Sequence, residues 1–267
     1  MQSSIVQPHP LKESLAVQVR VIGALLIREM LTRYGRHNIG FLWLFVEPMI
    51  FTLGITALWT ATKSVHGSDL PIVAFALTGY SSVLLWRSMP GRCIGALLAN
   101  ASLLYHRNIK PLDIYIARIL LEFGGATISF VVLSVVFISV GWIETPEDFL
   151  KVVAGWLLIA WFGSGLAITL GAMSYLSELV DKFWHPTSYL LFPLSGAAFL
   201  VAALPPFAQE VVLWIPMVHG VEMVRDGFFG SQARAVYDVN YIAMASLLFS
   251  AVSLLLVRYV SNRVVPG

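Results

Sequence analysis

The sequence has little charge for its length. Only 12% of its 267 residues are Asp, Glu, Lys or Arg, and 58% are hydrophobic, whereas a soluble domain carries about 25% charged residues. A chain this apolar could not cover its own surface against water, so the composition predicts an integral membrane protein. The net charge of +2 gives no reason to expect nucleic-acid binding.

The sequence also lacks most signatures of chemistry. Its one cysteine, Cys93, excludes an internal disulfide, and no cluster of metal ligands is present. No glycine-rich loop ends in Gly-Lys-Ser or Gly-Lys-Thr, so the chain is not expected to hydrolyse ATP itself. The first 18 residues contain no cationic segment followed by an apolar core, so no cleavable signal peptide is expected. No internal repeat or second domain is evident.

Long apolar runs dominate what remains. A helix needs about 20 mostly apolar residues to cross the roughly 30 Å hydrocarbon core of a bilayer. The candidate spans are 39–62, 71–86, 112–142, 149–173, 186–204 and 241–257. We therefore predict an all-α membrane protein, with six transmembrane helices in a domain over residues 39–267 and a cytoplasmic N-terminus over residues 1–38.

The distribution of Lys and Arg predicts the orientation of these spans. Thirteen of the 17 fall on the side that six spans give to both termini, and four fall on the other side. Lys and Arg concentrate in cytoplasmic loops, so both termini are predicted to be cytoplasmic.

Three further segments are expected at the membrane surfaces. Residues 11–36 are amphipathic at the helical period, which predicts a helix in the cytoplasmic headgroup plane or on a partner's surface. Residues 90–110 carry an apolar stripe at helical spacing, which predicts a short cytoplasmic helix on which another protein docks. Residues 205–238 are apolar but broken by prolines, which predicts re-entrant or interfacial helices on the outer side, packed against protein.

Two acidic residues lie inside the predicted spans. Glu47 is in the first span, before Pro48, and Glu122 is in the third, with Arg118 four residues earlier as an expected partner. A carboxylate at the middle of a membrane helix costs about 2.5–3.5 kcal/mol on insertion scales. Each acid is therefore either a substrate-path or gating residue, or a protonated or hydrogen-bonded group that fixes helix packing.

Small, aromatic and cationic residues in and near the spans have structural explanations, and the aromatic and cationic ones also have possible roles in binding. Gly163, Ala167 and Gly171 recur every four residues, which predicts close helix packing. The tryptophans fall mainly near span ends, where an interfacial belt explains them, although those that face a channel could stack on sugars. Arg87 and Arg92 flank the cytoplasmic end of the second span, either for topology alone or to bind an anionic headgroup or phosphate.

Four stretches, taken in order, resemble a known family. They are Arg36–Trp43 running into Glu47-Pro48, Leu77–Tyr80 with Trp86-Arg87, Asn100–Arg118, and Pro216–Met223 with Arg225. With the order of the predicted segments, these stretches resemble the ABC-2 type permeases, and in particular those of capsular polysaccharide exporters. Ile215 stands where many polysaccharide exporters have Asn, which favours the capsule branch over O-antigen or teichoic acid exporters.

The resemblance implies partners and a substrate. It implies a homodimer that binds two copies of a separate ATPase and exports a lipid-linked, usually acidic glycan to periplasmic adaptor and outer-membrane export proteins. ATP would be bound by the partner, and no cofactor is expected in this chain.

The resemblance also implies roles for individual residues. The expected substrate path contains Trp43, Glu47, Tyr80, Trp86, Arg87 and Arg92. The expected docking helix, at about 93–105, would contact the ATPase through Cys93, Leu97, Asn100, Leu104 and Tyr105. The expected re-entrant segment contains Pro216, His219, Glu222 and Arg225.

Three alternatives stay open at this level. The chain could be a related exporter of another lipid-linked polymer, a lipid or a drug. It could be a membrane-embedded acyl- or glycosyltransferase, although Gly163-Ser164-Gly165 lacks the glycine two residues before the serine that an intramembrane serine protease has, and no histidine lies in a predicted span. It could also be an assembly scaffold that transports nothing.

Overall fold

The computed structural model describes residues 11–34, 38–62, 70–105 and 109–264, and within them the chain is helical with no β-strand. The α-helices are α1 (Leu11–Tyr34), α2 (Asn38–Thr62), α3 (Ile72–Cys93), α4 (Ala96–Ala99), α5 (Pro111–Ser139), α6 (Phe149–Leu176), α7 (Leu179–Leu194), α8 (Pro206–Val212), α9 (Pro216–Phe229) and α10 (Val239–Val264). The 3₁₀ turns are η1 (Ala101–Tyr105), η2 (Val201–Ala203) and η3 (Gly230–Ala233). This confirms an all-α fold.

Among the residues that the structure describes, five helices are long and apolar enough to cross a membrane: α2, α3, α5, α6 and α10. They correspond to five of the predicted spans, although α3 continues past residue 86 to Cys93. The predicted span 186–204 is not confirmed, because α7 has only 16 residues and ends at Leu194. Pro193 lies in its last turn, and Gly196 follows with a φ of 83°, so the backbone leaves the helix well before residue 204.

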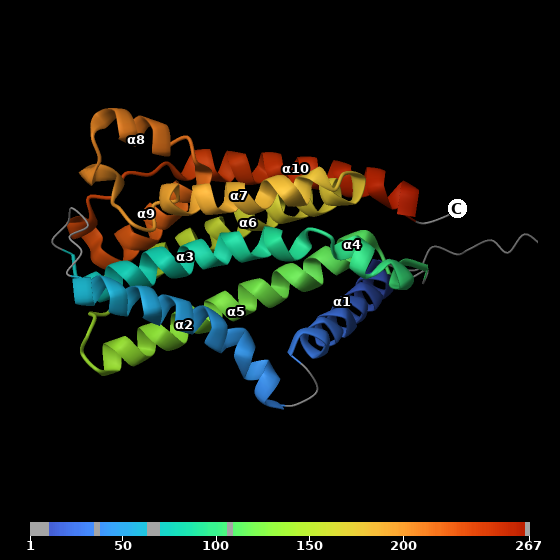
Figure 1. Cartoon of the computed structure of the whole chain (residues 1–267), viewed down its shortest axis with the longest axis horizontal. Coiled ribbons are helices and arrows are strands. Elements are labelled where there is room, and N and C mark those ends of the chain that lie inside the picture. The colour runs from blue at the N-terminus through green and yellow to red at the C-terminus, as the bar shows by residue number, and fades with distance from the viewer. Residues whose placement is uncertain (1–10, 35–37, 63–69, 106–108, 265–267) are drawn as a thin grey trace, which may run out of the picture.

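Helix α6 is the centre of the bundle. It packs against α3, α9 and α10, and Figure 1 shows α3 and α5 on one side of it and α10 on the other. Gly163 meets the backbone of Trp86 in α3, and Gly165 meets Phe249 in α10. A Cβ on Gly171 would lie 2.6 Å from Cε1 of Tyr115 and 2.9 Å from the carbonyl oxygen of Cys93. Close packing at the small residues of this helix is therefore confirmed.

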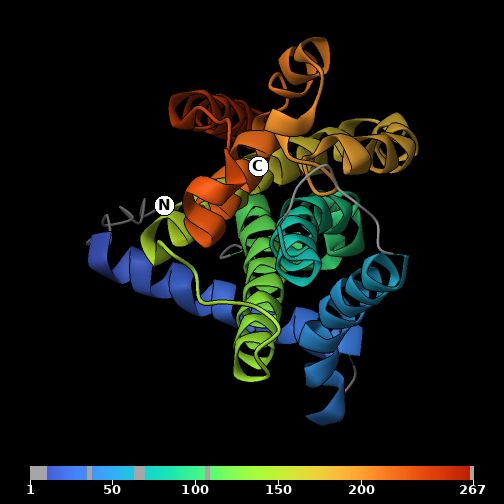
Figure 2. The same ribbon diagram turned by 90° about the vertical axis from the view of Figure 1, so that its left-hand side faces the viewer.

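Helix α1 lies across the bundle instead of along it. Figures 1 and 2 show it crossing α5 near the end of the bundle that carries α4. Its side chains Leu15, Val19 and Ile27 are 64%, 70% and 58% exposed, which fits a helix that rests in the headgroup plane.

The predicted docking helix at 93–105 is not one continuous helix. Gly95 has a φ of 68° and separates α4 from α3, and Asn100 ends α4 before η1 begins. The side-chain amide of Asn100 donates to the carbonyl oxygen of Ala96 at 2.9 Å. This competition by a side chain for a backbone carbonyl explains why the helix stops there.

The segment 205–238 folds as helices at the end of the bundle opposite α4 (Figure 1). Pro206 and Pro216 start α8 and α9, where proline costs no hydrogen bond. Eleven of the 14 residues of α9 are buried, so this helix packs inside protein as the sequence predicts.

We predict that Gly171→Ala destabilises the protein, whereas Gly124→Ala does not. A methyl group at Gly171 meets the Cys93 backbone, which cannot move as a side chain can, so the cost should be about 1–3 kcal/mol. Gly124 on α5 has open space around it, and alanine is the better helix former. Thermal unfolding of the two purified variants in the same detergent checks this, and equal melting temperatures would contradict it.

Candidate functional site

Five charged side chains from three helices form one network, here named the charge cluster: Glu29 and Arg33 of α1, Arg92 of α3, and Arg118 and Glu122 of α5. Nε of Arg118 lies 3.1 Å from the Glu29 carboxylate, and Nε of Arg92 lies 3.4 Å from the Glu122 carboxylate. Arg33 bonds both carboxylates. Four of the side chains are only 10–14% exposed, whereas Arg92 is 44% exposed.

The cluster corrects the predicted pairing of Glu122 with Arg118. Arg118 instead forms an ion pair with Glu29 and donates to the carbonyl oxygen of Arg92 at 2.5 Å. The Glu122 carboxylate forms its ion pairs with Arg33 and Arg92. A pair on one helix is worth only about 0.2–0.5 kcal/mol, so partners brought by α1 outweigh it. Sequence reasoning missed Glu29 and Arg33, although their spacing of four residues on α1 was a visible signal.

The cluster also changes the electrostatics of Arg33. Burial by itself would lower the pKa of its guanidinium, but the carboxylates of Glu122 and Glu29 together raise that pKa above its usual value. The two carboxylates therefore favour the charged form that an arginine has in any case at physiological pH.

A small cavity adjoins the cluster between α2, α3 and α5. Its volume is about 100 Å³, and its lining includes Glu47, Ser88, Arg92 and Glu122, so it has room for about three water molecules. The structure thus brings together two residues of the predicted substrate path, Glu47 and Arg92, with the second acid of the spans.

Arg87 and Tyr80 of the predicted path lie on the face of α3 that meets α7. The guanidinium carbon of Arg87 lies 4.7 Å from the ring centroid of Tyr189 and 5.9 Å from that of Phe192. The ring of Tyr80 meets Phe192 edge-on, with centroids 5.6 Å apart. Arg87 makes no ion pair within the described part of the chain, so cation–π contacts with these two rings are the interactions that stabilise its charge. Sequence reasoning did not identify Tyr189 or Phe192.

The two tryptophans of the predicted path have different surroundings. Trp43 is 52% exposed on α2, where a lipid or a substrate can reach it. Trp86 is fully buried and packs on Gly163 of α6. The structure therefore does not bring Trp86 to a surface with the other path residues, and its proposed contact with substrate stays a prediction.

At the opposite end of the bundle, Arg225 of α9 is fully buried. Its guanidinium donates to the carbonyl oxygens of Gly196, Ala197 and Phe199 at 2.5, 2.6 and 2.5 Å. It also lies over the ring of Phe75, 3.9 Å from the centroid. The turn after α7 leaves these carbonyls without helical partners, and the fixed fork of a guanidinium satisfies them.

Gly79 of α3 makes room for this arrangement. A Cβ there would lie 2.5 Å from Nη2 of Arg225 and from the carbonyl oxygen of Ala197. Two of the stretches that carry the family resemblance, one around Gly79 and one around Arg225, therefore meet in space.

Glu222 and His219 of the predicted re-entrant segment also form hydrogen bonds with backbone groups. Glu222 accepts a hydrogen bond from the backbone N–H of Val236 at 3.1 Å. The Nδ1 of His219 accepts from the N–H of Asp238 at 2.9 Å, so Nε2 carries the proton and donates to the carbonyl oxygen of Leu213 at 2.8 Å. His219 is thus a neutral structural group, which ties the loops on both sides of α9.

Comparison with known proteins identifies this architecture. A family model described as ABC-2 type transporter matches residues 20–229. The chain belongs to the ABC-2 type transporter family. This confirms the resemblance drawn from the four sequence stretches.

The curated relatives of this ABC-2 family member cover nearly its whole length. It is 47% identical to the capsule polysaccharide export inner-membrane protein CtrC of Neisseria meningitidis serogroup B, over 95% of this chain and 96% of the relative. It is 41% identical to the capsule polysaccharide export inner-membrane protein BexB of Haemophilus influenzae, over 96% of each chain. It is 27% identical to the polysialic acid transport protein KpsM of Escherichia coli, over 92% of this chain and 96% of the relative.

In this ABC-2 family member the predicted docking residues are mostly turned inward. Cys93, Leu97, Asn100 and Leu104 are at most 4% exposed, whereas Tyr105 is 79% exposed. Four of the five therefore anchor the segment 93–105 to the bundle, and only Tyr105 lies on its surface. Leu98, which is 58% exposed, is the large apolar neighbour that accompanies it. Contact with an ATPase stays a prediction.

The docking segment is fastened to α1. Arg28 donates to the side-chain oxygen of Asn100, and Gln18 donates to the Asp113 carboxylate at the start of α5. Together with the charge cluster, these bonds make α1, the docking segment and the first turns of α5 one polar unit.

We predict that Glu122→Gln destabilises this unit. The substitution leaves Arg33 and Arg92 without the carboxylate they share, which should cost about 1–3 kcal/mol. Glu210→Gln on the exposed part of α8 is the control. The measurement is the rate at which trypsin cleaves within α1 in native membranes, and we expect it to be higher in Glu122→Gln than in Glu210→Gln. Equal cleavage rates in the two variants would show that the cluster does not hold α1.

Proposed function

We propose that this chain is the membrane permease of an ABC exporter that moves lipid-linked acidic capsular polysaccharide across the bacterial inner membrane. The observation that carries the proposal is the 47% and 41% identity, over at least 95% of the chain, to CtrC and BexB, which are named as capsule polysaccharide export inner-membrane proteins. The five apolar helices agree with a membrane permease.

The proposal includes partners that this chain does not contain. A homodimer of the permease would bind two copies of an ATPase subunit, which holds the ATP, with both termini of the permease in the cytoplasm. Periplasmic adaptor and outer-membrane export proteins would receive the polymer. The absence of a phosphate-binding loop from the sequence supports a separate source of ATP hydrolysis.

The polar unit at the α4 end supports a route for coupling. An ATPase that moves the surface around Leu98 and Tyr105 would pull on Asn100, and through Arg28 on α1. Helix α1 would pass that movement to α3 and α5 through the charge cluster. The part-buried ion pairs of Arg33 and Arg118 resist stretching, because separating a charge from its partner at low exposure is costly.

The substrate would meet cationic and aromatic groups on the path. Arg92 is 44% exposed beside Glu47, and Arg87 lies between aromatic rings of α7. Guanidinium groups bind phosphate and carboxylate oxygens in pairs, and aromatic rings stack on sugars and cations. An acidic glycan on an anionic lipid offers both kinds of group.

Purification of the tagged full-length chain in mild detergent tests the partners. We expect mass spectrometry to find a stoichiometric subunit with ATP-binding motifs. In cells without this chain, we expect the lipid-linked polymer to accumulate inside. Recovery of no nucleotide-binding subunit across several detergents, together with normal surface polymer in the deletion strain, would overturn the proposal.

We predict that Arg92→Ala lowers surface polymer by roughly tenfold or more, as loss of a bidentate contact to an anionic group would. Arg92→Lys should restore part of the export, because it keeps the charge without the planar fork. Arg258→Ala, at an exposed position on α10, is the control for lost positive charge. Surface polymer is measured with membrane levels of each variant matched, and normal export by Arg92→Ala would remove Arg92 from the path.

A further inference from the structure

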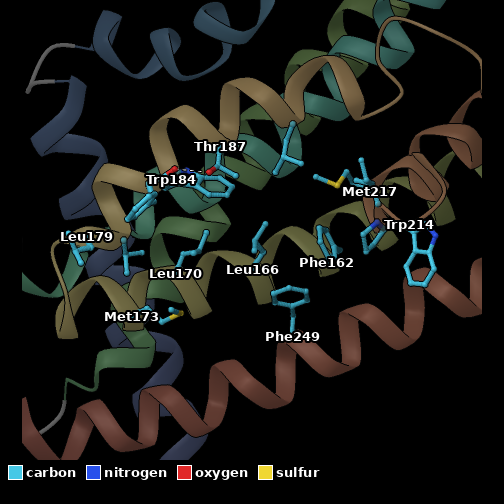
Figure 3. A pocket seen from close by; sticks show the side chains of 15 residues that line it. Phe162, Leu166, Leu170, Met173, Leu179, Trp184, Thr187, Trp214, Met217 and Phe249 are labelled. Carbon is cyan, nitrogen blue, oxygen red and sulfur yellow. Dashed lines mark hydrogen bonds between the residues drawn. The ribbon is translucent and has the colours of Figure 1, made fainter. Parts of the chain in front are cut away.

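The cavity beside the charge cluster has an acid in its wall that the cluster does not use. Its lining brings Glu47 of α2 to the same space as Arg92 of α3 and Glu122 of α5. The groove between α6 and α7 in Figure 3 is larger, but none of its 15 lining residues is charged. Glu47 makes no hydrogen bond or ion pair with another residue that the structure describes. A carboxylate in a membrane span is costly without a partner, so we expect another arrangement of the helices to give it one.

The charges of the cluster do not balance without Glu47. The cluster holds three arginines and two glutamates, which leaves one positive charge in excess. Glu47 carries one negative charge on the other side of a cavity of about 100 Å³. Charges at low exposure are stabilised by opposite charges nearby. The electrostatics therefore favour a movement that brings Glu47 to the cluster.

Arg92 is the arginine of the cluster that is free to reach Glu47. Its side chain is 44% exposed, whereas those of Arg33 and Arg118 are 12% and 14% exposed. If Arg92 leaves Glu122, that carboxylate keeps Arg33, which bonds it in the same network. Arg92 can therefore exchange one carboxylate for the other without leaving an acid of the cluster unpaired.

Helix α2 has a weak point next to Glu47. Pro48 lies inside the helix and has no N–H to donate to the carbonyl oxygen of Leu44. A side-chain hydrogen bond fastens this turn to α5, from the hydroxyl of Ser129 to the carbonyl oxygen of Phe45 at 2.6 Å. Proline is a common cause of helix bending. A bend at Pro48 can therefore carry Glu47 across the small cavity.

Contact with an acidic substrate does not explain Glu47. Its carboxylate would repel the carboxylate or phosphate groups of an acidic glycan, whereas Arg92 would attract them. A path must bind its substrate strongly enough for entry and weakly enough for release. A carboxylate that competes for Arg92 provides the release.

We propose that Glu47 is a positioning residue that takes Arg92 over from Glu122 during transport. Movement of the ATPase, passed on through the charge cluster, bends α2 at Pro48 and closes the cavity. Arg92 then bonds Glu47 and withdraws from the anionic group of the substrate. The proposal rests on the proposed function, and it gives Glu47 a role through Arg92 instead of a contact with the glycan.

A pair of cysteines across the cavity tests the movement. Phe51 of α2 and Leu84 of α3 also line it, so Phe51→Cys with Leu84→Cys reports closure as the rate of disulfide formation. The substrate-free exporter complex, with its ATPase subunits, is compared without nucleotide and after trapping with ATP and vanadate. We expect trapping to raise the rate roughly tenfold, as one charge-assisted bond would. Each cysteine alone, beside the fully buried Cys93, is the blank.

Glu47→Gln, introduced into the cysteine pair, shows whether the charge drives the closure. The amide keeps the shape of the side chain without its charge, and we expect the rise on trapping to disappear. Glu210→Gln, exposed on α8 at the opposite end of the bundle, should keep the rise. Equal thermal stability of the two variants in detergent identifies the loss as one of switching. No rise in the parent pair, or a rise that persists in Glu47→Gln, would overturn the proposal.

A double-mutant cycle on export gives a second measurement. We expect Glu47→Gln and Arg92→Gln each to lower surface polymer roughly tenfold at matched membrane levels. The double variant should lose no more than Arg92→Gln alone, because both changes remove the same pair. A loss that multiplies to roughly a hundredfold would show that the two residues act independently and would reject the exchange.

The exchange and the proposed function fail in different ways. A complex that contains its ATPase and exports normally, yet shows no closure linked to Glu47, rejects the exchange and leaves the proposed function standing. Failure to recover an ATPase, with normal surface polymer in cells that lack the chain, would instead reject the proposed function.

Discussion

Helix α6 can occupy the centre of this bundle because its glycines let neighbouring backbones come within van der Waals contact. Gly163 receives α3, Gly165 receives α10, Gly171 receives the end of α3 and α5, and Gly155 receives α9. Lipid tails are as apolar as leucine, so burial of apolar surface gives little drive for helices to associate in a membrane, and close contact must supply it. The positions of α3 and α9, and through them every polar site described above, depend on these contacts.

Arginines satisfy buried or part-buried polar groups at both ends of the bundle, but the groups differ. At the α4 end, Arg33 and Arg118 satisfy carboxylates brought by another helix. At the opposite end, Arg225 satisfies three carbonyl groups of a turn. Charges and free carbonyls are both expensive away from water, so each arginine fixes the position of the segment it serves. Neither arginine holds α7 in the same way, and of its 16 residues only Trp184 and Ser188 are buried.

The sequence predicted well whatever depends on local pattern. The five long helices, the cross-lying α1 and the buried α9 follow from apolar length, helical period and proline position. It failed at α7, where apolar composition continued past the residues that end the helix. The role of the segment 93–105 as a surface for a partner stays a prediction, although Leu97 and Leu104 of its apolar stripe face inward. An apolar stripe looks the same whether it packs on its own protein or on another.

Composition and pattern by themselves determined that this chain is a helical membrane protein, where its main helices lie, and which family it resembles. The physical reason is that few backbone structures are stable in lipid, and a helix that crosses it requires a long apolar run that is visible in the sequence. Only the tertiary structure decided which partner each buried charge takes. Glu122 lies four residues from Arg118, yet it pairs with Arg33 from 89 positions earlier in the chain. The bundle places α1 across α5, and a pairing set by such a crossing has no trace in the spacing of one helix.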